Sequence, residues 1–174
     1  MTPTPLFTAR FFVMCAYTFT VFVSLFQLLP AAPYHVLALG GTTFAGGLFL
    51  GFLTYASALS APFTGQVADR LGHRRVLIVV SVVLAAFTAT YAVLDNYKVL
   101  LGLVFVHGLF WSALLSASGA YITSIIPDSR RAEGIGYWGL SSVIALAAAP
   151  PLGFWVYSYG WTALCVEISA LNLL

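Results

Sequence analysis

The chain has 174 residues, of which 61% are hydrophobic and only 7% are charged, and its mean hydropathy is +0.98. A soluble domain of this size carries roughly a quarter of its residues as charged side chains, so the composition excludes a water-soluble monomer. It also excludes a disordered chain, which needs low hydrophobicity and high charge. The formal net charge of +2 is too small for a nucleic-acid-binding face.

Long stretches without a charged residue divide the chain into membrane-spanning segments. No Asp, Glu, Lys or Arg occurs in 11–68, 76–94, 99–127 or 134–166. About 20 helical residues cross a bilayer core of roughly 30 Å, and apolar segments in lipid must be helical because every backbone polar group needs a partner within the protein. The sequence therefore predicts an all-α, polytopic membrane helical bundle with spans at about 11–29, 43–68, 76–94, 99–123, 133–155 and 161–174.

Turn-forming residues separate the first two of these spans. Pro30, Pro33, Gly40 and Gly41 supply turn chemistry after the first span. We therefore expect the first helix to end at about residue 29 and the connection to begin at Pro30.

The positions of the basic residues predict the orientation of the spans, because short cytoplasmic loops carry an excess of Lys and Arg. The opposite orientation would export all the arginines. We therefore expect a multi-pass protein of the cell membrane (inner or plasma membrane) with a cytoplasmic N-terminus. This arrangement leaves only Lys98 outside and places inside Arg10, Arg70, Arg74, Arg75, Arg130 and Arg131.

The most distinctive segment is the predicted cytoplasmic connection at residues 65–75, which reads Gly-Gln-Val-Ala-Asp-Arg-Leu-Gly-His-Arg-Arg. Gly65 and Asp69 share a helix face, where a glycine lets another helix approach closely. The Asp69 carboxylate can accept hydrogen bonds from a helix N-terminus or an arginine. Gly72 permits the left-handed turn that reverses the chain.

This segment resembles the signature loop of the major facilitator superfamily, with His73 in the place of the first basic residue. The resemblance implies a conformational-switch role for the loop, carried by Gly65, Asp69, Arg70, Gly72, Arg74 and Arg75. The second and third of these arginines, at 74 and 75, can also anchor the next helix to anionic headgroups. The alternative interpretation is a generic, positively charged connection with a helix cap.

Two further stretches agree with this resemblance. Val106-His107-Gly108-Leu109 in the fourth span is similar to the R-F-x-H-G pattern of many of these transporters, although Val104 occupies its arginine position. That arginine is linked to proton coupling in the family. Residues 130–136, Arg-Arg-Ala-Glu-Gly-Ile-Gly, look like the R-x-x-x-x-G loop that opens the fifth helix.

A third stretch lies near the end of the fifth span. Ala145, Ala149, Pro150 and Gly153 occupy the main positions of a G-x-x-x-G-P-x-x-G motif found in antiporter branches, with two of its glycines replaced by alanines. Small residues allow a close helix crossing, and a proline kinks a membrane helix. By resemblance, this helix-five motif favours export.

Family members consist of two six-helix halves with the substrate site between them, and the resemblance covers residues 1–174 as the N-terminal half. We expect the C-terminal half to be absent and the chain to be a fragment, because residues 161–174 span only about 21 Å. The implied function is secondary transport, in the direction of efflux, of a small organic solute by alternating access. The alternative is a truncated, non-transporting membrane assembly module that dimerises or pairs with a partner.

The resemblance also implies which spans line the central cavity, namely the first and the fourth. Candidate substrate-binding residues are therefore Tyr17, Gln27, His107 and Trp111. Gln27 could instead bond the backbone before Pro30, and a neutral histidine in a membrane helix often bonds a neighbouring helix. The Gly47–Gly51 pair in the second span is expected to serve helix packing.

Glu167 is the only charged residue well inside a predicted span. An intramembrane carboxylate is a functional candidate by default, so Glu167 is the candidate for proton coupling. The alternative is a carboxyl group that is protonated or that reaches toward the outer surface.

The sequence gives no indication of an enzyme or of a bound cofactor. Neither H-E-x-x-H nor G-x-S-x-G occurs, and Cys15 and Cys165 fit no zinc-binding spacing. We expect a transport protein whose partners are the lipid bilayer and a small-molecule substrate, with no metal, cofactor or nucleic acid.

Overall fold

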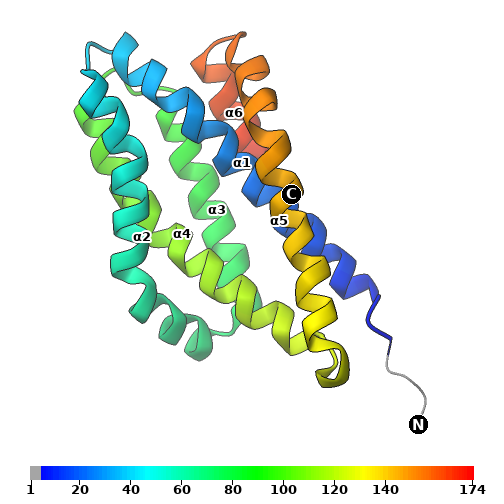
Figure 1. Ribbon diagram of the computed structural model, residues 1–174. Helices are drawn as coiled ribbons and strands as arrows, with labels where there is room; N and C mark the ends of the chain where they lie inside the picture. Colours follow the sequence, from blue (N-terminus) through cyan, green and yellow to red (C-terminus); the bar gives the residue numbers. More distant parts are fainter. Residues whose placement is uncertain (1–4) are drawn as a thin grey trace.

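The computed structural model describes residues 5–174, and that part of the chain is helical with no strand (Figure 1). Five of its helices are long and apolar enough to cross a membrane, whereas α6 has 11 residues. The predicted all-α bundle is therefore confirmed. The elements are α1 (Ala9–Ala38), α2 (Thr43–Leu71), α3 (His73–Tyr91), α4 (Tyr97–Ile125), the short 3-10 helix η1 (Asp128–Arg130), α5 (Arg131–Tyr157) and α6 (Trp161–Leu171).

The end of α1 differs from the prediction. The sequence predicts a turn from Pro30, but α1 continues through Pro30 and Pro33 to Ala38. Proline has a fixed φ close to the helical value, and neighbouring helices help a membrane helix to tolerate its missing donor. Here a Cβ on Gly46 of α2 would lie only 3.2 Å from the Pro33 Cβ, so α2 packs directly on this part of α1. The chain reverses only after α1, where Gly40 has a φ of +82°.

Polar side chains cap three of the helices. Thr8 Oγ1 accepts a hydrogen bond from the Phe11 N–H at the start of α1, and Thr42 Oγ1 accepts one from the Ala45 N–H at the start of α2. Asn96 Oδ1 accepts one from the Lys98 N–H at the start of α4. Each cap satisfies a backbone donor that has no partner within the helix, which explains why these helices begin where they do.

The helices pack as two close pairs with a second layer behind them. The most extensive helix–helix contacts are those of α2 with α4 and of α1 with α5. α3 packs against α4 and α6. Successive helices alternate in direction, so the α1–α2, α3–α4 and α5–α6 connections lie at one end, shown at the top of Figure 1. The connection at residues 65–75, the α4–α5 connection and the start of α1 lie at the other end. All the arginines are therefore at one end and Lys98 is at the other, while the cytoplasmic placement of the arginine end stays a prediction.

The outer surfaces of the helices are apolar, as expected for a bundle in contact with lipid. Large apolar side chains such as Phe44 on α2, Val79 on α3 and Trp155 on α5 are exposed. The interior is closed by side chains such as Phe49, Leu28 and Leu114, which are fully buried. α5 buries few residues, and those few are small: Gly134, Ala145, Ala149 and Gly153.

Candidate functional site

The connection between α2 and α3 is built around Gly72. This residue ends α2 and begins α3, and its φ of +87° lies in the region that favours glycine. Its carbonyl oxygen accepts hydrogen bonds from the Arg75 N–H at 3.0 Å and the Val76 N–H at 3.2 Å. The chain therefore reverses within a single residue, as the sequence predicts for this position.

The Asp69 carboxylate interacts with the residue that replaces the first basic position of the family pattern. His73 Nε2, on the first residue of α3, lies 3.0 Å from Asp69 Oδ1. Within residues 5–174 no other group bonds this carboxylate. Gly65 has no atom of the described chain within 4 Å of an added Cβ, so its face of α2 is open.

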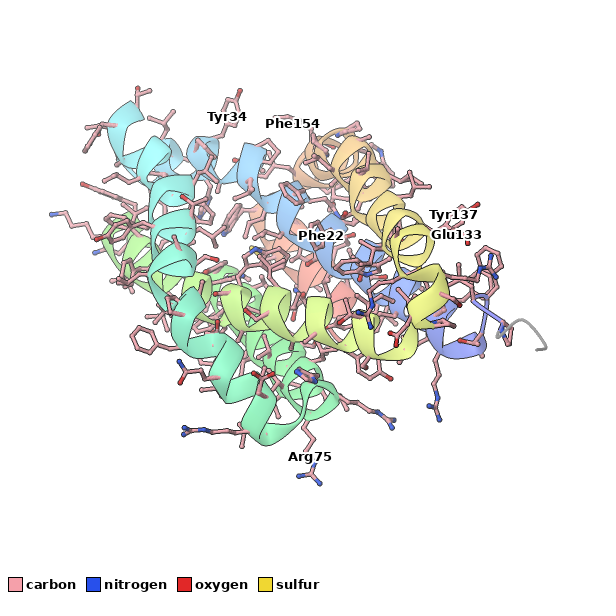
Figure 2. All side chains as sticks on the ribbon, turned by 60° about the horizontal axis from the view of Figure 1, so that its bottom comes forward. Phe22, Tyr34, Arg75, Glu133, Tyr137 and Phe154 are labelled. Atoms are coloured by element: carbon pink, nitrogen blue, oxygen red, sulfur yellow. The ribbon has the colours of Figure 1, made fainter. Side chains whose placement is uncertain are left out.

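The three arginines of this connection are exposed, and none pairs with a carboxylate in the described part of the chain. Figure 2 shows Arg75 directed away from the bundle. Arg70 and Arg74 belong to the same exposed turn. The structure therefore presents a cluster of positive charge at this end of the bundle, where anionic headgroups would be accessible to it.

The α4–α5 connection at the same end is closed by ion pairs. Arg130 donates to Glu133 through Nε to Oε2 at 2.8 Å and through an Nη atom to Oε1 at 2.7 Å, and Arg131 pairs with Asp128. Glu133 and Tyr137 lie together on the first turns of α5 (Figure 2). These pairs join η1 to the first turn of α5.

The helix-five motif forms the contact between α5 and α1. Ala145 and Ala149 are fully buried, and Gly153 lies one turn further along the same face. A Cβ on Gly153 would lie 2.7 Å from the backbone oxygen of Gln27 and 2.9 Å from its Cα. α5 continues as a helix through Pro150. The small residues of the motif therefore allow α5 to pack directly against the α1 backbone.

Gln27 and Glu167, which the sequence assigns to different roles, are in direct contact. Gln27 Nε2 donates to Glu167 Oε1 at 3.1 Å, and this bond joins α1 to α6. Gln27 is fully buried. The alternative bond from its amide to the backbone before Pro30 is not formed, since the side chain is directed toward α6.

The other candidate substrate residues also use their polar atoms between helices. The Tyr17 hydroxyl lies 2.8 Å from Ser81 Oγ on α3, and His107 Nδ1 lies 3.0 Å from the Tyr91 hydroxyl, also on α3. His107 is 2% exposed. In this conformation Tyr17 and His107 therefore face the second layer of the bundle rather than the side where α1, α2, α4 and α5 meet.

Trp111 lies between α1 and α4 in an aromatic group that we define as Phe22, Phe26 and Trp111. The Phe22 ring lies 5.5 Å from the Trp111 ring and 5.8 Å from the Phe26 ring, measured between centroids. Figure 2 shows Phe22 in the middle of the bundle, between the ribbons of α1 and α4. Tyr34 and Phe154 meet at the far end of α1, with ring centroids 6.0 Å apart.

Further polar contacts between helices involve Tyr91 and Trp138, which no sequence motif indicates. Tyr91 bonds His107 with its hydroxyl, and its backbone oxygen accepts a bond from Trp161 Nε1 at 2.8 Å. Trp138 Nε1 on α5 donates to Thr18 Oγ1 on α1 at 2.7 Å. No sequence spacing indicates these bonds, since each joins two different helices.

Comparison with known proteins identifies the class of protein that has this architecture. The family described as Major Facilitator Superfamily matches residues 5–174. The chain belongs to this superfamily of membrane transport proteins, and its multi-pass membrane character follows from the same match together with the apolar helices.

Two relatives are named as resistance proteins. The chain is 26% identical over 126 residues to the "Probable multidrug resistance protein EmrY" of Escherichia coli (strain K12), covering 71% of this chain and 25% of that protein. It is 27% identical over 139 residues to the "Quinolone resistance protein NorA" of Staphylococcus aureus (strain Mu50 / ATCC 700699), covering 78% of this chain and 34% of that protein. The chain thus spans between a quarter and about a third of the length of these relatives.

Proposed function

We propose that this chain is the N-terminal half of a secondary transporter that exports a small organic solute by alternating access. The observation that carries the proposal is the superfamily match over residues 5–174, together with relatives named for multidrug and quinolone resistance. The substrate site lies between two such halves in this fold. The second half is supplied by a longer chain, a partner or another copy of this chain.

The aromatic group Phe22, Phe26 and Trp111 is our candidate wall for the solute. Aromatic side chains offer large, apolar and rigid surfaces to a flat organic molecule. Tyr17, Gln27 and His107 remain proposed substrate contacts that require α1 or α4 to move relative to α3 and α6. The contact that supports such a movement is the small-residue surface of α5 against α1.

The connection at residues 65–75 is our proposed conformational switch, placed on the cytoplasmic side of the plasma membrane. The Asp69–His73 pair holds the turn between α2 and α3, and the neighbouring arginines are positioned to contact headgroups or a second half. Glu167 is the proposed group that couples transport to a proton.

Fluoroquinolone accumulation in cells that produce the protein tests this proposal. We expect less accumulation than in cells without the protein, and we expect Asp69→Asn to abolish the difference at equal membrane abundance. Asp95→Asn, which removes a carboxylate from the α3–α4 connection at the opposite end, is the matched control and should retain export. Normal export by a well-folded Asp69→Asn variant would remove the switch role, and unchanged accumulation by the wild type would contradict export of this solute.

Assembly without transport is the second candidate function, and the open face of α2 favours it. An added Cβ at Gly47 or Gly51 would meet no atom of the described chain within 4 Å, so this G-x-x-x-G surface is available to another helix. Cross-linking of a Gly47→Cys variant in mild detergent tests this candidate. A cross-linked dimer without export would support assembly, and a strictly monomeric species would contradict it.

A further inference from the structure

The contact between Gln27 and Glu167 leaves two buried oxygens without partners. The Gln27 amide donates one bond, from Nε2 to Glu167 Oε1 at 3.1 Å. Gln27 Oε1 and Glu167 Oε2 are both buried, and neither has a hydrogen-bond partner in the described part of the chain. Buried polar atoms normally have partners because an unsatisfied one costs about 1–3 kcal/mol. The pair is therefore one donor short.

No neighbouring cation makes up this deficit. α6 packs against α1, α3 and α5, and within residues 5–174 no Lys, Arg or His forms an ion pair with Glu167. An unpaired carboxylate inside a membrane span is expensive. The titratable groups of these four helices that lie in the interior or beside α6 are Tyr17 and His35 of α1, Tyr91 of α3, Tyr157 of α5 and Cys165 of α6, and none of them hydrogen-bonds to Glu167.

We propose that Glu167 and Gln27 together form a binding site for a single proton. A proton taken from water converts the Glu167 carboxylate into a carboxylic acid, whose O–H is the missing donor for an amide carbonyl. In the protonated pair, the Gln27 amide N–H donates to one oxygen of the acid, and the O–H of the acid donates to the amide oxygen. On release, the proton returns to water and leaves a carboxylate that retains only the bond from Gln27 Nε2.

The position of Gln27 connects this site to the helix-five motif. The Gln27 backbone packs directly against Gly153 of α5, and the Gln27 side chain hydrogen-bonds to Glu167 of α6. Loss of the proton therefore weakens the α1–α6 contact at the point where α5 rests on α1. Only this connection to helix movement rests on the proposed transport function, whereas the proton site does not.

Infrared difference spectroscopy of the full chain in phospholipid nanodiscs tests the site. A neutral carboxylic acid has a carbonyl stretch that a carboxylate lacks. The other four acidic residues lie at the ends of the helices or in the connections between them, at Asp69, Asp95, Asp128 and Glu133. We expect an acid band at neutral pH that disappears in Glu167→Gln, shifts in Gln27→Leu and persists in Asp95→Asn. Absence of the band in the wild-type chain, or its persistence in Glu167→Gln, would overturn the proposal.

The pH dependence of stability provides a second readout. Because the folded bundle holds the proton, we expect the melting temperature of the wild type to fall as pH rises. Glu167→Gln places an amide, which does not titrate, at the same position. Its melting temperature should not change with pH over the range in which that of the wild type falls. The same fall in both proteins would overturn the proposal, whichever variant folds better. If the wild type shows the acid band but exports no solute, the proton site is supported and only the proposed transport function is refuted.

Discussion

Substitution of Gly153 by alanine should separate α5 from α1. The new Cβ would lie 2.7 Å from the Gln27 backbone oxygen, 2.9 Å from its Cα and 3.0 Å from its Cβ. Carbon atoms in good contact are about 3.5–4.0 Å apart, so the helices must move apart by roughly 1 Å. The nearest atoms are backbone, which cannot rotate away. Overpacking of this kind costs about 1–3 kcal/mol, and we expect a loss of that size in the free energy of unfolding.

Gly139→Ala is the matched control, because Gly139 lies on the same helix and no atom of the described chain lies within 4 Å of its added Cβ. Alanine is favoured over glycine in a helix by up to about 1 kcal/mol, so this variant should be as stable as the wild type or more stable. Denaturant-induced unfolding in mild detergent, followed by tryptophan fluorescence, measures both variants. Equal stability of Gly153→Ala and Gly139→Ala would refute the direct contact between α5 and the α1 backbone.

Two further substitutions test contacts made by α4. Gly108→Ala would drive a Cβ into the α2 backbone and should lower the free energy of unfolding by about 1–3 kcal/mol, whereas Gly119→Ala on the same helix meets open space and should be neutral or stabilising. Tyr91→Phe removes the buried bond to His107 and should cost about 1–3 kcal/mol, while Tyr55→Phe, at an exposed position, should change the same unfolding measurement little. Equal effects within either pair would contradict the assigned contacts.

The helices were predictable because their signal is local. Charge-free stretches of spanning length identify five of the helices to within a few residues at most ends, and the left-handed turn at Gly72 follows from the chemistry of glycine. The end of α1 was predicted wrongly at Pro30, since the effect of a proline depends on what packs beside it. Gly46 of α2 is that neighbour, since a Cβ added to it would lie 3.2 Å from the Pro33 Cβ, and no local pattern shows it.

The candidate site was less predictable because its contacts join distant helices. Gln27 and Glu167 were each recognisable as polar groups inside a span, but their bond connects residues 140 positions apart. Tyr17 and His107 were expected beside a central cavity, and their partners on α3 depend on how each helix is rotated about its axis. Side-chain periodicity on apolar helices gives little information on that rotation, because residues facing lipid and residues facing the core are equally hydrophobic.

The proposed switch and transport functions depend on a bundle that crosses the membrane with its arginine-rich end in the cytoplasm. Labelling of single cysteines in intact cells by a membrane-impermeant maleimide tests this, in a background in which Cys15 and Cys165 are replaced by alanine. We predict that Lys98→Cys reacts from outside and that Arg75→Cys reacts only after the membrane is permeabilised. Reaction of Arg75→Cys from outside intact cells, with Lys98→Cys protected, would contradict the orientation and the switch and transport proposals that rest on it.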